Sequence, residues 1–427
     1  MDPENRFSRR LMGMLSARLP EAEFDELDDP RKSRGRRWDH GALLGLMVVG
    51  LGCGVRSLAQ LERLSAEMSP VCRKRLGIQR RVPDTTARDL ICQEDPNELR
   101  QGLHRIVRAA HRRKALEPDG LPFGVVSIDG KSTAIHGCDD NYAQRQSNDT
   151  RLVGLVRTAT CALVSAAAVP CIDVVSIPAE TNEMGAFESV LRSLYASYSS
   201  LKLFRLVSYD AGACSLHNAG VVRELGLDYL FALKDSQPTL RTEAERLLAT
   251  LAPSQASAST EDVTGIGTVV RRVYLTEEMA DFCDWTHLRT VVRIESETLN
   301  KKGERMAHEN RYYLSSVKRA TLSDNQWLML VRKHWGVENN CHHTLDTAFA
   351  EDDHPWIQAD PRGALVVMVL RRIAYTILTL FRRVTQRSEN RRAIPWAVLL
   401  DSLRYALIRA SEALLVGLRT RTLALPV

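Results

Sequence analysis

The chain has 427 residues, of which 44% are hydrophobic and 26% are charged, the composition of an ordinary soluble globular protein. Nine cysteines, an odd number with no C-x-x-C pair, argue against a disulfide framework or a zinc ribbon and favour a reducing, cytoplasmic environment. No apolar run follows the first residues, and the most apolar stretches, 43–55 and 366–381, are too short or are interrupted by Arg371 and Arg372. We therefore expect no secretory signal and no membrane partner.

The net charge of +6 is unevenly distributed along the chain. Residues 1–120 carry 23 Lys and Arg against 18 Asp and Glu, and residues 361–427 carry 12 against 3. Residues 121–360 carry 23 against 31. The basic helices can be read as solvated faces. Binding of a polyanion by the two basic ends, with cation-coordinating chemistry in the acidic middle, explains the asymmetry better.

The first 118 residues are predicted to be helical. Apolar spacing predicts helices over 40–51, 57–68, 88–92 and 101–116. Gly52 and Gly54 should end the first of them, and a basic loop should follow Pro70. Two short helices around a basic turn are compatible with a helix-turn-helix reader of DNA, although most such pairs are packing units. We interpret 1–118 as a helical N-terminal DNA-binding domain.

Residues 119–240 are predicted to alternate between strands and helices. Strands are expected over 123–128, 152–169, 172–177, 204–209 and 229–233, and helices over 182–198 and 215–224. This succession is the order of an RNase H-like mixed sheet. In that architecture a carboxylate on the central first strand lies beside the end of the fourth strand. We therefore predict an α/β fold with an RNase H-like core that begins in residues 119–240.

Two further regions complete the predicted organisation. Residues 241–318 are expected to form a β-rich insertion, with a helix over 243–249 and strands over 268–275, 288–296 and 311–316. Residues 319–427 are expected to be helical, to complete the catalytic core and to end in a basic region.

Two aspartates directly follow apolar strands. Asp129 comes after residues 123–128 and Asp210 after residues 204–209, so each should project from the edge of the sheet. A strand commonly ends in an Asp-Gly or Asp-Ala turn, so neither aspartate alone indicates chemistry. On neighbouring strands the two can hold the Mg²⁺ ions that displacement at a phosphodiester needs, because a few carboxylate ligands suffice.

The third candidate acid lies in a polar stretch, 334–352. His334, Glu338, His342 and Asp346 recur every four residues and should form a polar ridge on one helix face. Arg332 precedes this ridge and is a candidate for bidentate contact with a phosphate. A zinc site made of Glu338, His342 and Asp346 is the competing chemistry, although the spacing lacks the His-Glu-x-x-His pattern of a zinc hydrolase.

Seven strings of residues follow one another along the chain: Ile128-Asp129-Gly130-Lys131, Leu163-Val164-Ser165-Ala166, Thr181-Asn182-Glu183-Met184, Tyr209-Asp210-Ala211, Phe231-Ala232-Leu233-Lys234, Arg311-Tyr312-Tyr313-Leu314-Ser315-Ser316 and the spaced residues from Arg332 to Asp352. In this order they resemble the insertion-sequence DDE transposases of the H-repeat-associated branch. Residues 29–31, the Leu/Gly-rich helix after them and residues 83–88 also resemble the N-terminal domain associated with that family. Together these strings cover most of the chain in the order of the family.

The resemblance implies Mg²⁺-dependent DNA cleavage and strand transfer at the ends of a mobile element, with Mn²⁺ able to substitute. It implies that Asp129, Asp210 and Glu338 are the catalytic, metal-binding triad. Water would attack first and free a 3′-hydroxyl, which would then attack target DNA. The implied partners are double-stranded DNA, as terminal inverted repeats and as target, and further copies of the chain assembled on that DNA. The implied setting is a bacterial cytoplasm, at the nucleoid when bound to DNA.

The resemblance also implies supporting residues and shows departures. Lys131 and Arg332 would contact phosphates or order the acids, and His342 and Asp346 would support Glu338. The chain departs from the family by lacking its usual arginine shortly after Lys131, by replacing a common aromatic after His342 and by lengthening residues 138–151. The departing residues are Ser132, Thr133, Ala134 and His343.

Two alternatives remain open at this point. One is a domesticated, non-catalytic DNA-binding relative that keeps the fold and the basic flanks. The other is an RNase H-like nuclease without strand transfer, which would give nicked products but no joined ones.

Overall fold

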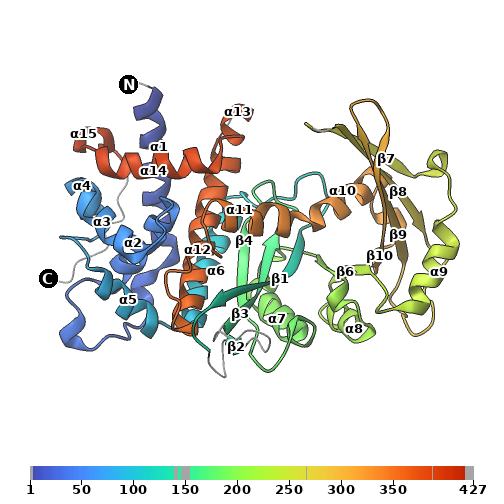
Figure 1. Cartoon of the computed structure of the whole chain (residues 1–427), viewed down its shortest axis with the longest axis horizontal. Helices are drawn as coiled ribbons and strands as arrows, with labels where there is room; N and C mark the ends of the chain where they lie inside the picture. The colour runs from blue at the N-terminus through green and yellow to red at the C-terminus, as the bar shows by residue number, and fades with distance from the viewer. Residues whose placement is uncertain (1–2, 139–142, 146–153, 266, 387, 419–427) are drawn as a thin grey trace.

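The computed structural model describes residues 3–138, 143–145, 154–265, 267–386 and 388–418. These residues form a mixed α/β protein in which the central part of one large sheet lies between two different ends (Figure 1). A helical body that contains the first and the last described helices occupies one end. A β-rich lobe, formed by residues 238–315, occupies the other. The predicted α/β class is confirmed at this level.

In the described part of the chain the sheet has ten strands, nine of them in one path. In spatial order these are β2 (Ala143–Arg145), β3 (Gly154–Leu163), β1 (Val125–Ile135), β5 (Leu206–Tyr209), β6 (Asp228–Leu233), β10 (Arg305–Ser315), β9 (Thr290–Asn300), β8 (Gly267–Thr276) and β7 (Ala258–Val263). The tenth strand, β4 (Cys171–Ser176), pairs with β3 outside this path. Strands β1, β5 and β6 are parallel, and the other pairings are antiparallel.

The strands that carry the two candidate aspartates are neighbours, as predicted. Ile128 of β1 pairs with Tyr209 at the end of β5. Strand β1, however, continues through Asp129 to Ile135, because residues 130–135 pair with β3 as far as Gly154. The prediction that this strand ends before Asp129 is therefore wrong.

The N-terminal helices are α1 (Pro3–Arg18), α2 (His40–Gly52), α3 (Leu58–Glu67), α4 (Pro70–Arg75), α5 (Asp84–Gln93) and α6 (Pro96–Arg112). Helix α2 forms as predicted and is buried along its whole length, with the Asp39 carboxylate accepting the Ala42 N–H at 2.8 Å. Gly54 follows it with a φ of +70°, a conformation that favours glycine. The basic loop predicted after Pro70 is in part wrong, because α4 begins there under a Ser69 cap.

The buried helix α12 (Pro361–Leu380), continued by the π-helical turn η9 (Phe381–Thr385), is at the centre of the helical body. Among the described residues it is the helix long and apolar enough to span a membrane, but it is wholly buried within the protein. It packs against α2, α6 and strand β4. Burial of an apolar helix against helices and a sheet accounts for its composition.

The two ends of the described chain pack together. Helices α14 (Trp396–Arg409) and α15 (Glu412–Leu415) lie against α1, and a short helix, α13 (Glu389–Arg392), precedes them. The Arg9 side chain of α1 donates to the carbonyl oxygens of Leu414 and Val416 at 2.5 and 2.6 Å. The basic N-terminal and C-terminal segments are therefore parts of one body, although they are far apart in sequence.

The remaining helices lie around the sheet and the lobe. They are α7 (Glu183–Tyr198), α8 (Leu216–Glu224), α9 (Pro238–Leu248), α10 (Asp324–His334), the π-helical turn η8 (Val337–His342) and α11 (His343–Thr347). Strand β7 was not predicted; it is an edge strand whose side chains alternate between half-buried and exposed. Most of the long segment 138–151 lies outside the described residues.

Candidate active site

Asp129 and Asp210 lie side by side on the sheet, because each directly follows the last paired residue of β1 and β5 in their common register. Asp129 is half-buried, and its Oδ2 lies 3.1 Å from Nδ1 of His342. Asp210 Oδ1 accepts the backbone N–H of Gly212 at 2.8 Å. The two carboxylates that the sequence predicted to converge are thus brought together.

Glu338 lies in a π-helical turn, not in the continuous α-helix that the sequence predicted. Helix α10 ends at His334, and residues 337–342 form a π-helical turn, which holds more residues per turn than an α-helix. The predicted ridge of four-residue repeats is therefore wrong. His334 is buried under the sheet, where it contacts Ser208 Oγ at 3.1 Å and its carbonyl accepts from Ser127 Oγ at 2.9 Å. Burial lowers the pKa of His334 to about 4.

The π-helical turn brings His342 onto Asp129. Burial alone would lower the pKa of His342, but the hydrogen bond to Asp129 raises it. The resemblance implied that His342 and Asp346 support Glu338. In the described residues neither of them hydrogen-bonds to Glu338, and His342 supports Asp129 instead.

A fourth carboxylate, Glu183, completes the group and was not predicted as a site residue. It lies in the first turn of α7, which Asn182 caps by accepting the Gly185 N–H at 3.0 Å. Its carboxylate lies over Gly130, where an added Cβ would be 1.9 Å from it. A glycine next to Asp129 is therefore what lets Glu183 approach. The sequence signal was the string 181–184 at the start of a helix, which resembled the family motif but reads equally well as a helix cap.

The four acids influence one another electrostatically. Partial burial, and then the charges of Asp129 and Asp210, raise the pKa of Glu338. Burial, followed by the same two aspartates, raises the pKa of Glu183. Negative charge is thus concentrated at this edge of the sheet.

The donor set suits a hard divalent cation, because Mg²⁺ and Mn²⁺ prefer carboxylate oxygens and keep several waters. A cation would also relieve the repulsion among the four acids. In the part of the chain that the structure describes, no three His, Cys, Asp or Glu side chains are close enough together to hold one ion. The acids therefore fit such an ion by chemistry, and side-chain rotation would have to bring them onto it.

Lys131 and Asp346 form a separate ion-pair cluster beside the four acids. Lys131 is nearly buried, and its Nζ pairs with Asp346, with Asp352 at 3.3 Å and with Glu351 at 3.9 Å. Burial raises the pKa of Asp346 even though Lys131 opposes this shift. Lys131 thus links strand β1 to the segment after Glu338.

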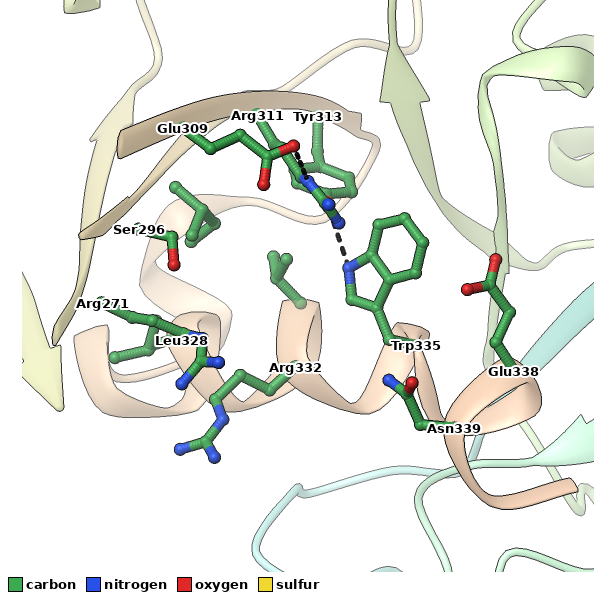
Figure 2. A pocket seen from close by; sticks show the side chains of 12 residues that line it. Arg271, Ser296, Glu309, Arg311, Tyr313, Leu328, Arg332, Trp335, Glu338 and Asn339 are labelled. Atoms are coloured by element: carbon green, nitrogen blue, oxygen red, sulfur yellow. Dashed lines mark hydrogen bonds and ion pairs between the residues drawn. The ribbon is translucent and has the colours of Figure 1, made fainter. Parts of the chain in front are cut away.

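Arg332 of α10 points into the lobe. Its Nη2 lies 2.9 Å from Oδ2 of Asp262, the penultimate residue of β7. Arg332 also lines a cavity of about 440 Å³ that reaches Glu338, drawn in Figure 2. A second cavity of about 350 Å³ joins Glu338 to Asp210 and contains Lys234, Arg241 and Arg311. Basic side chains therefore line the two cavities that reach Glu338 and Asp210 on the lobe side.

No family model matches the chain. The chain is 28% identical over 194 residues to Putative protein YbfL and to H repeat-associated putative transposase YhhI of Escherichia coli strain K12, which covers 41% of this chain and 47% of each relative. It is 26% identical over 187 residues to Putative transposase YncI of Escherichia coli O157:H7, which covers 42% of this chain and 45% of that relative. The chain therefore spans about half the length of the curated relatives it matches.

Among solved structures, the chain is similar to the piggyBac transposase in its synaptic complex with hairpin DNA. The TM-score is 0.45 and the identity 11%, with 95% of this chain and 80% of that chain covered. Two of these sequence relatives are named as putative transposases, which agrees with the predicted resemblance to transposases. At modest identity, the chain is thus related in sequence to proteins named as transposases.

Proposed function

We propose that the chain is a DDE transposase, which cleaves DNA at the ends of an insertion sequence and joins the cut end to target DNA. The observation that carries the proposal is the placement of Asp129 and Asp210 on neighbouring parallel strands, with Glu338 close enough for its pKa to respond to both. The strand order β4-β3-β1-β5-β6 supports it, because this is the order of an RNase H-like sheet. The names of the sequence relatives support DNA as the substrate.

Asp129, Asp210 and Glu338 would hold Mg²⁺ in this enzyme. Bound divalent ions supply relief of phosphate charge and activation of the attacking oxygen. The residues of the chain orient the acids: His342 holds the Asp129 carboxylate through Nδ1, and the Gly212 N–H holds Asp210. The buried His334 fixes the end of α10 against β1 and β5, and thereby the start of the turn that carries Glu338.

The rest of the chain takes the roles expected from the sequence. Residues 119–240 and the start of 319–427 would make the RNase H-like catalytic core, and 241–318 the insertion. Residues 1–118 and the basic C-terminal region would bind DNA, assembled as more than one copy on the two ends of the element. The two basic segments pack together in one helical body, which supports a shared role in DNA binding.

The test uses purified protein, Mg²⁺ or Mn²⁺, and DNA with the sequences that flank the gene, with Glu338→Gln assayed alongside. We expect cleaved and joined products with the unaltered chain and neither with the variant. Glu188→Gln, a carboxamide substitution at a partly exposed acid of α7, serves as the matched control and should behave as the unaltered chain. Nicked products without joined ones would establish a nuclease instead. Binding without cleavage in either metal would establish a non-catalytic DNA-binding protein.

A further inference from the structure

The cavity beside Glu338 lies between the β-rich lobe and α10. Apolar side chains of Ile294, Leu328 and Val331 contribute to its wall. Figure 2 shows the guanidinium groups of Arg271 and Arg332 near each other on one side, with Trp335 between them and Glu338. The cavity therefore leads from a pair of arginines to a candidate catalytic acid.

The carboxylate of Asp262 pairs with both of these arginines. Oδ2 of Asp262 pairs with Nη2 of Arg332 at 2.9 Å and also accepts from Nη1 of Arg271. The three side chains are between 29% and 43% exposed, so solvent reaches the cluster. Two guanidinium groups against one carboxylate leave one positive charge without a partner in the cluster.

The carboxylate is carried by an edge of the sheet. Within the described residues, strand β7 pairs only with β8 and is the last strand of the path. Asp262 is followed by Val263, which is 87% exposed. An edge strand that is paired on one side has fewer contacts to hold it than an inner strand has.

We propose that Arg271 and Arg332 bind a phosphate of the DNA backbone in this cavity, and that Asp262 holds the two arginines until the phosphate displaces it. Arginine forks bind phosphate oxygens in a bidentate manner, as they bind a carboxylate, so one anion can replace the other. The cavity continues through Glu338 to the second cavity, which Asp210 lines. A strand with one phosphate at the arginines would thus run along α10 towards the acids.

The inference rests on the proposed function and deepens it by naming a backbone contact and the group that competes for it. It makes opposite predictions for the two members of one ion pair. Asp262→Asn should strengthen DNA binding, because it frees both arginines and removes a charge that repels phosphate. Arg332→Gln should weaken binding, because it removes a phosphate contact. An ion pair remote from the bound DNA would give no such opposition.

The experiment measures binding of a fluorescein-labelled duplex, carrying the sequences that flank the gene, by anisotropy in EDTA at several salt concentrations. Asp262→Asn should bind on the order of fivefold more tightly, the size of one charge interaction at the solvated surface. Arg271→Gln and Arg332→Gln should each bind more weakly and lower the salt slope by about 1. The matched controls are Glu243→Gln and Arg246→Gln, an arginine–glutamate pair on α9 of the same lobe, which should leave affinity and slope unchanged.

The outcomes separate this inference from the proposed function, because binding is measured without metal and cleavage with it. Cleavage by the unaltered chain, together with equal binding by Asp262→Asn, Arg332→Gln and their controls, would overturn the inference and leave the function standing. Opposite shifts in binding without cleavage by the unaltered chain would support the inference and overturn the function. Absence of DNA binding by the unaltered chain at low salt would overturn the inference.

Discussion

Two groups of acidic side chains on the sheet have opposite electrostatic surroundings. On strand β4, Asp173 is fully buried, and its carboxylate accepts hydrogen bonds from Nε and Nη2 of Arg100 at 3.0 and 2.8 Å. Nε2 of His104 lies 2.9 Å from the same carboxylate. Burial alone would raise the pKa of Asp173, but His104 and Arg100 together hold it well below its usual value.

At the edge formed by β1 and β5 the acids face other acids. In the described part of the chain, none of Asp129, Glu183, Asp210 and Glu338 forms an ion pair with Lys or Arg, and only Asp129 pairs with a histidine, His342. The pKa values of Glu183 and Glu338 are raised rather than lowered. The difference teaches that a compensated acid joins helix α6 to the sheet, whereas acids without a Lys or Arg partner mark the place where a cation would supply the missing positive charge.

The largest expected effect is on catalysis at the uncompensated acids. Asp129→Ala or Asp210→Ala should abolish cleavage, a loss beyond the roughly 10²- to 10³-fold caused by removing one preorganised hydrogen-bond donor. Binding to terminal DNA should remain largely intact, because the phosphate contacts lie elsewhere. Gel assays of cleavage and binding check this prediction. Cleavage at the unaltered rate by either variant would show that the triad assignment is wrong.

The compensated region should respond in stability instead. Asp173→Asn leaves Arg100 buried without its counter-charge, and we expect the free energy of unfolding to fall by about 3–5 kcal/mol. Urea unfolding measures the loss. Adding Arg100→Met to that variant should recover part of it, because the two side chains are coupled. Strictly additive losses would mean that the pair does not act as a unit.

A second compensated pair allows a pH test. His40 Nε2 lies 2.9 Å from Oε2 of the buried Glu94; burial alone would lower the pKa of His40, but the hydrogen bond and charge of Glu94 raise it. The stabilisation that the His40–Glu94 pair gives is therefore complete below the pKa of about 6.5 that histidine has in the unfolded chain. It is lost as the pH rises through the pKa of His40 in the folded protein. His40→Gln should cost about 1.5–3 kcal/mol at pH 5.5, the usual contribution of a charged hydrogen bond, and less at pH 9. Urea unfolding midpoints at the two pH values measure this loss of stability. A loss that is the same at both pH values would contradict the predicted pH dependence.

The smallest expected effect is a gain in stability at the site. Glu183→Gln removes one of the mutually repelling charges, since above its raised pKa the ionised Glu183 opposes folding. The gain in EDTA should stay below about 1 kcal/mol, because solvent screens partly exposed carboxylates. Mg²⁺ should stabilise the unaltered chain more than the variant, by mass action on the folded state. Thermal unfolding with and without Mg²⁺ measures both, and a variant less stable than the unaltered chain in EDTA would refute the repulsion.

The sequence predicted those elements whose signals are local. Apolar runs located β5 and β6, and Asn182 before a helical pattern located the start of α7. The neighbouring positions of Asp129 and Asp210 followed from the order of strands and helices alone. The strands and the helix start were predictable because each depends on residues close together in sequence, whereas the position of the two aspartates came from matching the order of elements to an RNase H-like sheet.

The features that were missed depend on residues far apart or on unusual helix geometry. A four-residue repeat predicts a continuous α-helix, so the π-helical turn that moves His342 onto Asp129 left no sequence signal. Strand β7 has a polar pattern because it is an edge strand. Glu183 was missed because only the fold places it over Gly130.

The central claim, that the uncompensated acids bind divalent metal, is tested most directly by titrating the full chain with Mn²⁺ and measuring free Mn²⁺ by electron paramagnetic resonance. The unaltered chain should bind Mn²⁺ in competition with Mg²⁺. Asp129→Asn combined with Asp210→Asn should lose that binding, while Asp173→Asn, which alters a compensated acid, should keep it wherever the variant is folded. Equal Mn²⁺ binding by the double variant and the unaltered chain would contradict the account.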